Sequence, residues 1–195
     1  MPLHFHAAPW PAGLKLISAL GTIIITGAGY AAYRAIPTPS GFTHYFGLGI
    51  ALVFPAILVL SLLFAVTGYA VDGSDLYIQR PFWHTRIPLD GLSRFWLEPT
   101  ACKGSLRIFG NGGLYSFTGL YWSRKLGRFR LFATDLAQSV VLVLPARVVV
   151  VTPATPRAFV DHLHHLFPLS DVGPEGSSGR GVEQVKPSGN SRPPL

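Results

Sequence analysis

The densest group of chemically active side chains is a basic segment in the second half of the chain. Four basic residues fall within positions 124–130, namely Arg124, Lys125, Arg128 and Arg130. A cation beside an anionic membrane leaflet contributes about 1 kcal/mol to the free energy of membrane binding, so this segment could hold lipid phosphates or an acidic partner. A solvated basic loop that leads into a strand explains the same residues. Both interpretations stay open, and the four residues are our candidate ligand-binding residues.

The preceding segment, residues 110–122 (GNGGLYSFTGLYW), combines glycine with aromatic residues. It lacks the GK[ST] ending and the following helix of a phosphate-binding loop. One interpretation is an aromatic loop that dips into lipid headgroups or grips a peptide. The other is that its aromatic side chains fill the core of a domain, because Tyr, Phe and Trp dominate cores and interfaces alike.

The sequence contains no set of residues that demands catalysis. His162 and His165 lie three positions apart on an expected helix, but an HExxH motif and a cysteine pair are both absent. Cys102 neighbours Lys103, yet no histidine is placed to act as its base. A GxSxG nucleophile motif is also missing. We therefore expect no enzyme activity, metal or cofactor, with a metal-dependent membrane enzyme as the weakest alternative.

Composition places the chain at a membrane. Charged residues make up 13% of the 195 residues, against roughly 25% in a typical soluble domain. Residues 16–33 and 46–66 contain no charged side chain, and a helix needs about 20 apolar residues to cross a bilayer. We predict a transmembrane hairpin over residues 14–66, with helices at about 14–35 and 44–66 and an N-terminal segment before it. Small residues four apart, Gly27 and Ala31 on the first helix and Gly47 and Ala51 on the second, are expected where the helices touch.

The distribution of charge predicts the orientation of this hairpin. Lys15, Arg80 and Arg86 flank one end of the two helices, and only Arg34 lies at the other. Because positive charge is retained in the cytoplasm, both termini are expected there, in a multi-pass protein of the cell membrane. A cleaved signal peptide that ends near residues 27–32 is the alternative. No ionisable residue lies at mid-depth, so ion-coupled transport is not expected.

Residues 67–168 change to short alternating runs, which indicate β-strands. The expected strands are residues 75–80, 84–89, 92–97, 105–109, 128–134, 140–144 and 148–152. Helical spacing then predicts an amphipathic helix over residues 157–167, with Pro156 at its start. From residue 169 to 195 the apolar pattern stops, and we predict a disordered tail.

The segments GYAVDGSDLYIQR, RIPLDGL, GLYSFTGLYWSRKLGRFRLFATD and VVVVTPATPRAFVDHL, across residues 68–163, resemble the bacterial pleckstrin-homology-like (PH-like) membrane proteins. The resemblance implies a two-helix transmembrane hairpin followed by a mainly β PH-like domain, a small bent antiparallel sheet or barrel capped by a C-terminal helix. It implies no particular ligand and assigns no functional residue.

The function expected from the sequence is a membrane-anchored interaction or scaffolding module. Its expected partners are the lipid bilayer and another membrane or membrane-associated protein, bound at the cytoplasmic face. The alternative is an anionic-lipid sensor that uses residues 124–130. Nucleic acid is not expected as a partner, because a membrane-attached chain without a recognisable reader fold lacks the usual context.

Overall fold

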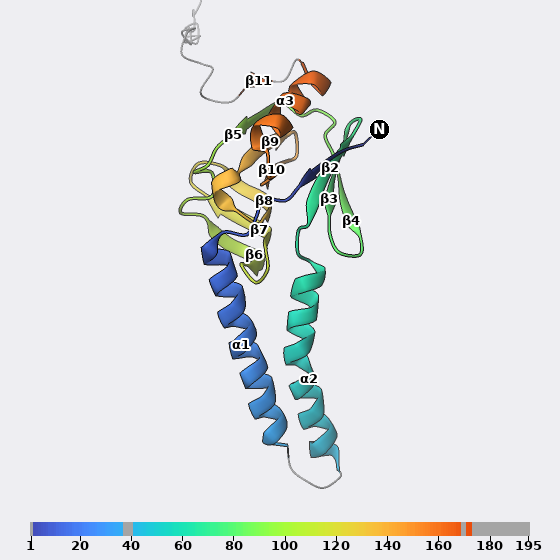
Figure 1. The fold of residues 1–195 in the computed structure, drawn as a ribbon, viewed down its shortest axis with the longest axis vertical. Coiled ribbons are helices and arrows are strands. Elements are labelled where there is room, and N and C mark those ends of the chain that lie inside the picture. The colour runs from blue at the N-terminus through green and yellow to red at the C-terminus, as the bar shows by residue number, and fades with distance from the viewer. Residues whose placement is uncertain (1, 37–40, 169–170, 173–195) are drawn as a thin grey trace, which may run out of the picture.

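A computed structural model describes residues 2–36, 41–168 and 171–172. Two long helices, α1 (Ala12–Arg34) and α2 (Phe42–Leu63), form an antiparallel pair that projects from a β domain (Figure 1). With 23 and 22 residues they are long and apolar enough to cross a membrane, and only 11% and 6% of their most apolar stretches is buried. A helix of a soluble core would be mostly covered, so these helices present apolar side chains outward.

Small residues let the two helices approach, at the expected positions on α2 but not at the expected Gly27 on α1. A Cβ on Gly29 would lie 3.0 Å from the Cβ of Phe54 on α2, and one on Gly47 would lie 3.2 Å from Ile36. Ala51 is also buried in this contact. Gly27, where we expected the contact, has nothing within 4 Å of such a Cβ. Our prediction is therefore confirmed for Gly47 and Ala51 but wrong for Gly27, and Gly29, on nearly the opposite face of α1, makes the contact instead.

The β domain contains two sheets among the described residues. The four-stranded sheet has the order β1-β2-β3-β4, and the seven-stranded sheet has the order β11-β5-β9-β10-β8-β7-β6. Their strands are β1 (Leu3–His6), β2 (Gly68–Asp72), β3 (Asp75–Gln79), β4 (His84–Pro88), β5 (Arg94–Leu97), β6 (Leu106–Gly112), β7 (Phe117–Ser123), β8 (Gly127–Ala133), β9 (Val140–Leu144), β10 (Arg147–Val151) and β11 (Asp171–Val172). A short 3-10 helix, η1 (Leu136–Gln138), precedes β9, and α3 (Pro156–Leu166) follows β10.

The segment before α1, to which we assigned no structure, belongs to the β domain. Strand β1 pairs antiparallel with β2, with Phe5 opposite Tyr69. The ring of Phe5 meets that of Phe159 on α3 edge-on at 5.0 Å, and Ala8 donates its N–H to the carbonyl of Thr152 at 2.8 Å. The chain therefore enters α1 from the β domain and returns to the same domain after α2.

One apolar core joins both sheets and α3. Phe159 and Leu163 of α3 are fully buried against Leu76 and Ile78 of the four-stranded sheet and Phe95 of the seven-stranded sheet. Tyr69 is also fully buried in this core. Its hydroxyl donates to the carbonyl of Phe132 at 2.7 Å and accepts the N–H of Thr152 at 3.1 Å. Burial raises the pKa of Tyr69 to about 12, so the phenol is neutral at physiological pH.

The architecture is the predicted one: two apolar helices, then a mainly β domain with a C-terminal helix. Each strand expected from alternation is present, and α3 begins at the expected Pro156. Two features differ. Strand β10 pairs in parallel with β8, and the strands divide into two sheets rather than one bent antiparallel sheet. Within the predicted disordered tail, Asp171–Val172 form β11 beside β5, and residues 169–170 and 173–195 lie outside the described residues.

Replacing Tyr69 by Phe should destabilise the β domain. The substitution keeps the ring but leaves the buried Thr152 N–H and Phe132 carbonyl without this partner, at a cost of about 1–3 kcal/mol. Thermal unfolding of the full-length protein in detergent micelles measures the loss. Tyr45→Phe, at an exposed position on α2, is the matched control and should leave the midpoint unchanged. Equal midpoints for Tyr69→Phe and the natural protein would contradict this role of the hydroxyl.

Candidate membrane-facing site

The β6–β7 hairpin lies between the two helices at their domain end. Figure 1 shows its turn reaching down between α1 and α2. On α1, the buried Ser18 hydroxyl donates to the carbonyl of Gly113 at 3.2 Å and accepts the N–H of Tyr115 at 2.9 Å. One turn further along, the Tyr115 hydroxyl lies 2.8 Å from the Thr22 hydroxyl, which bonds to the carbonyl of Ser18. The Ser18 and Thr22 hydroxyls thus find hydrogen-bond partners within the protein rather than in water.

A hollow separates the hairpin from α2. Leu114 lies against Gly21 of α1, 3.1 Å from a Cβ built there, and it lines a hollow together with Ile57 and Leu60 of α2. Two glycines allow its strands to come this close. Gly110 and Gly119 face each other with φ of 111° and 139°, and a Cβ on either would collide with the backbone of the other strand. Residues 110–122, which we considered as an aromatic loop, therefore belong to a β-hairpin that is bonded to α1.

Arg80, just after β3, joins α2 to both sheets. Its guanidinium donates to the carbonyl of Phe64, which caps α2, and lies 5.3 Å from the Phe64 ring. On its other side it lies 5.7 Å from the ring of Phe132 on β8. A cation is favourable at the carboxyl end of a helix and over aromatic rings. Burial lowers the pKa of Arg80 from its usual value, but arginine stays charged in proteins.

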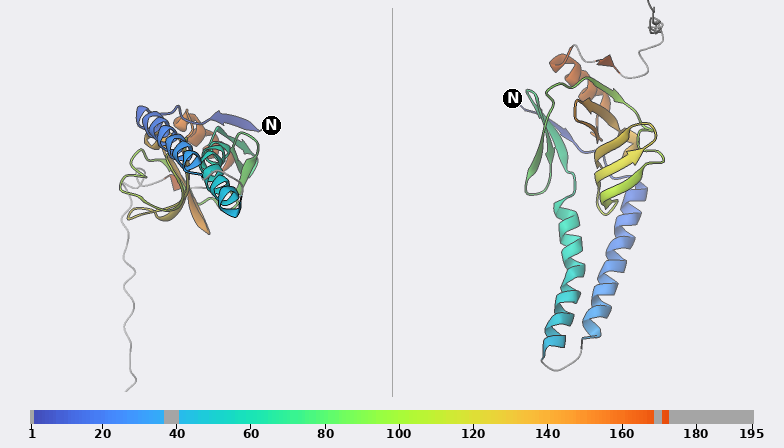
Figure 2. Two further views of the ribbon diagram at one scale, coloured as in Figure 1. Left: turned by 90° about the horizontal axis from the view of Figure 1, so that it is seen from below. Right: turned by 180° about the vertical axis from the view of Figure 1, so that it is seen from behind.

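Strand β6 is the edge strand of the seven-stranded sheet and the strand of that sheet nearest to the helices (Figures 1 and 2). It carries large apolar side chains that the fold leaves uncovered: Leu106 is 65% and Phe109 is 79% exposed, and Ile108 is also exposed. Trp122 stands opposite Leu106 in the register of β7. We call Leu106, Ile108, Phe109 and Trp122 the β6 platform. A single exposed apolar residue is ordinary, but a row of them on one strand indicates a contact surface.

Basic residues surround one end of this platform. Lys103, Arg124 and Lys125 line a hollow of about 520 Å³ together with Leu106 and Trp122, and we call it the basic hollow. The Lys125 ammonium donates to the hydroxyl of Thr100 at 3.3 Å. The same hydroxyl donates to Glu98, a bond that holds the pKa of Glu98 below its ordinary value, with the charge of Lys125 as a weaker cause. Anions that enter the hollow would meet three cations beside two apolar side chains.

The four predicted residues of the basic segment therefore lie on one side of the sheet. Arg124 and Lys125 occupy the β7–β8 turn and line the basic hollow. Arg128 and Arg130 are exposed on β8, opposite Trp122 and Leu120 respectively, and paired residues share a face. Lys103 was missed, because its approach to Arg124 depends on the pairing of β6 with β7. The signal for the platform was present in the apolar residues of β6, which we took only as an ordinary strand.

The histidines of α3 and Cys102, which we considered for metal binding and catalysis, pack against other side chains of the β domain. His162 packs near Phe5, with ring centroids 6.1 Å apart, and His164 packs on Phe95 at 4.6 Å. Cys102 is buried beside Ser139, and burial raises the pKa of its thiol, which disfavours the reactive thiolate. Across the described part of the chain, no three His, Cys, Asp or Glu side chains come together as a metal site.

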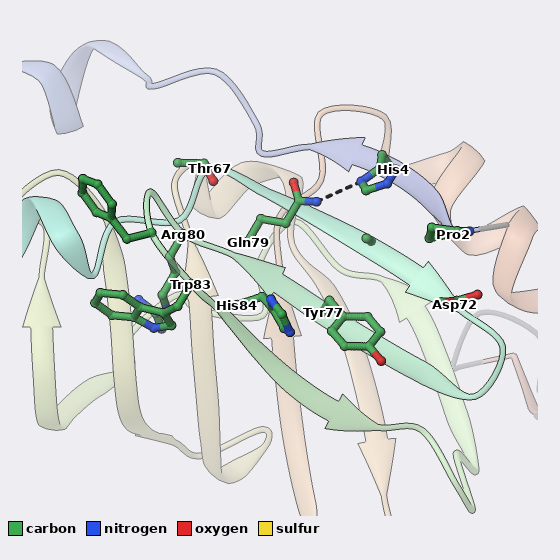
Figure 3. A pocket seen from close by; sticks show the side chains of 11 residues that line it. Pro2, His4, Thr67, Asp72, Tyr77, Gln79, Arg80, Trp83 and His84 are labelled. Atoms are coloured by element: carbon green, nitrogen blue, oxygen red, sulfur yellow. Dashed lines mark hydrogen bonds between the residues drawn. The ribbon is translucent and has the colours of Figure 1, made fainter.

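A second concave surface lies on the outer face of the four-stranded sheet. This polar groove has a volume of about 500 Å³ and is drawn in Figure 3. Its floor is Ala70, and its polar walls include His4 of β1, Tyr77 and Gln79 of β3, and His84 of β4. The amide nitrogen of Gln79 lies 2.8 Å from Nδ1 of His4, and the Tyr77 and His84 rings meet edge-on at 5.2 Å. Without β1, this groove would lack one wall.

Two apolar helices, long enough to span a membrane, leave and re-enter a β domain capped by α3, an architecture consistent with a PH-like fold. Comparison with known families agrees: residues 67–166, just over half of the chain, match the Bacterial PH domain family. The chain belongs to this family, as the resemblance in the sequence predicted. The match begins after α2, so both helices and β1 lie outside it. No curated protein and no solved structure matches the chain.

Replacing Ser18 by Ala should loosen the β6–β7 hairpin from α1. The Tyr115 N–H would lose its acceptor at a buried position, which costs about 1–3 kcal/mol. Hydrogen exchange of the full-length protein in micelles should then show roughly tenfold faster exchange of the Tyr115 amide. Thr26→Ala, at an exposed position on the same helix, is the control. Unchanged exchange at Tyr115 would show that the hairpin is held by its apolar contacts alone.

Proposed function

We propose that this protein is a membrane-anchored binding module that crosses the cell membrane twice and rests its PH domain on the anionic cytoplasmic leaflet. The observation that carries the proposal is the β6 platform, a row of exposed apolar side chains on the strand nearest to the two helices. If α1 and α2 span the bilayer, β6 lies level with the first turn of α1 (Figure 1), where lipid headgroups would surround it.

The chemistry of this surface suits a membrane–water interface. Leu106, Ile108 and Phe109 would enter the boundary between headgroups and acyl chains, and an indole such as that of Trp122 prefers the same depth. The basic hollow adds three cations, each worth about 1 kcal/mol near an anionic leaflet. This arrangement favours the lipid-binding alternative for the basic segment over a basic loop that is only solvated.

Charge supports a cytoplasmic domain. Lys15 and Arg80 flank the domain ends of α1 and α2, and the cations of the basic hollow lie on the same side. Among the described residues, Arg34 is the only formal charge near the opposite ends of the helices. Since short segments beside membrane helices keep Lys and Arg in the cytoplasm, the proposed orientation follows.

The position of β1 argues for an anchor that is retained rather than cleaved. A signal peptidase cut near residues 27–32 would remove β1 together with Ser18. The β domain would then lose Phe5 from its core and the bond from the Thr134 hydroxyl to the carbonyl of Ala8. It would also lose the hydrogen bonds that hold the β6–β7 hairpin. We therefore propose that both helices persist in the mature protein and that its N-terminal strand lies on the domain side.

Topology can be tested with a cysteine at Ser74, which is exposed in the β2–β3 turn. Cys102 is buried, so it is replaced by Ala to leave one reactive thiol. We expect Ser74→Cys to react with a membrane-impermeant maleimide only after the cells are permeabilised. A cysteine at Gly41, at the opposite end of the helices, should react in intact cells. The reverse pattern would place the domain outside and refute the proposed contact with the cytoplasmic leaflet.

The leaflet contact can be tested with a spin label at Phe109→Cys in the Cys102→Ala background. In vesicles that contain phosphatidylglycerol, the label should lie at headgroup depth, whereas a label at Ser74→Cys should stay in water. Replacing Lys103, Arg124 and Lys125 by Gln should remove up to about 3 kcal/mol of attraction and draw the Phe109 label toward water. Equal water accessibility at positions 109 and 74 would overturn the proposal.

The sequence also predicts a protein partner and no enzyme activity, and both stay predictions. The β6 platform would be occupied by lipid in the proposed arrangement, so a protein partner needs another surface. Of the remaining concave surfaces, the polar groove lies on the opposite sheet and is free of the leaflet contact.

A further inference from the structure

The polar groove begins at the membrane end of the domain. Thr67 follows α2 directly and lines the groove, as does Trp83, whose ring meets that of Phe64 at the end of α2 at 5.0 Å. Phe82, also in the lining, is 80% exposed. From this aromatic end the groove runs along β2 toward Asp72, at the turn farthest from the helices (Figure 3). A chain that left the bilayer beside α2 would enter the groove without changing direction.

The size of the groove suits an extended chain. Gly68 and Asp72 are four residues apart on β2, so this path is about 13 Å long, the span of four extended residues at about 3.3 Å each. The floor is low because β2 presents Gly68 and Ala70 on this face, between the His4 wall and the Tyr77 and His84 wall. Imidazole, phenol and amide groups in these walls could bond to an extended backbone, and Phe82 and Trp83 offer an aromatic anchor.

Two formal charges line the groove: Arg80 at the membrane end and Asp72 at the far end. Asp72 is exposed at the far end and makes no ion pair among the described residues. The nearby Asp75 does pair, with its Oδ2 2.7 Å from Nη2 of Arg86. Arg80 also lines the groove, but its guanidinium is held by the carbonyl of Phe64 and the rings of Phe64 and Phe132. The unpaired charge that an occupant meets is thus a carboxylate, and a basic residue complements it.

We infer that the polar groove binds the segment of a second membrane protein that directly follows a transmembrane helix, with a Lys or Arg of that segment at Asp72. Membrane helices are followed in the cytoplasm by short segments rich in Lys and Arg, which is the chemistry the groove fits. The basic residue would stand about four or five positions beyond the end of the partner's helix. This inference rests on the proposed membrane anchoring and orientation, but not on the leaflet contact.

The test uses the full-length protein in nanodiscs of phosphatidylcholine, where the leaflet carries no net charge and electrostatic contact with the β6 platform is absent. The probe is a synthetic peptide with an uncharged transmembrane helix and a short flexible tail that carries one lysine four residues beyond the helix. A matched peptide carries glutamate there. A photo-reactive benzoylphenylalanine replaces Tyr77 in the wall of the groove. A second protein carries it at Ala146, in the exposed β9–β10 turn, as the positional control.

We expect the lysine peptide to crosslink at position 77 about three-fold more than the glutamate peptide, the ratio typical of one exposed ion pair. Asp72→Lys should reverse the preference. Asp90→Lys is the matched control, because Asp90 is an exposed acid outside the groove, and it should leave the preference intact. The Ala146 position should crosslink neither peptide.

Equal yields from the two peptides at position 77, or a reversal by Asp90→Lys as well, would overturn the inference. The topology experiment at Ser74 separates this failure from that of the proposed function. If the protein inserts as proposed but shows no preference between the peptides, only the assignment of the groove is overturned. If the domain lies outside the cell, the proposed function is overturned, and the expected source of a basic segment is removed with it.

Discussion

The hydrogen bonds between β1 and β2 hold together two segments that the chain separates by both long helices. Because β1 precedes α1 and β2 follows α2, this pairing fixes where each helix leaves the β domain. The domain ends of the helices are therefore set apart, while Gly29 and Gly47 let them approach further along. At this end the β6–β7 hairpin is bonded to α1 through Ser18, and a hollow lined by Leu114 lies between the hairpin and α2. Placement of β6 beside the helices is thus a consequence of the β1–β2 pairing.

This geometry gives the two sheets different surroundings. The seven-stranded sheet turns its edge toward the helices and bears the β6 platform and the basic hollow. The outer face of the four-stranded sheet carries the polar groove, which is lined by neutral polar groups and by Arg80 and Asp72. A leaflet field falls off within about 8–10 Å at physiological salt, so cations are useful only on the surface nearest to the lipid. In the polar groove Arg80 lies at the membrane end and Asp72 at the far end, so a basic segment would find its attraction at Asp72 (Figure 3).

The sequence predicted those parts of the structure that depend on local patterns. Two long uncharged runs are enough for α1 and α2, alternation was enough for β3, and an apolar, β-branched run was enough for β9. The sequence did not predict β1, where four residues are too few to distinguish a strand from a loop, or β2, whose side chains are buried on both faces. It also did not predict β7, where glycine and polar residues interrupt the alternation. The site was only half predictable for a related reason. Arg124 and Lys125 are neighbours in sequence, whereas Lys103 joins them only through strand register.

The prediction for Gly27 on α1 failed for the same reason, because long-range contacts do not follow from local sequence patterns. Two small residues four positions apart identify a helix face that could pack against another helix. Many faces of α1 carry small residues, however, and which of them packs depends on where the helix starts in space. That start is set by β1 and by the bond from Tyr115 to Ser18, both long-range contacts. Arg80 sets the corresponding end of α2 by joining Phe64 to β8. Since both helices are tied to the domain at these ends, a partner that shifted α2 would act on Arg80 and hence on both sheets. A segment in the polar groove would lie beside this joint, because Trp83 contacts the groove on one side and Phe64 on the other.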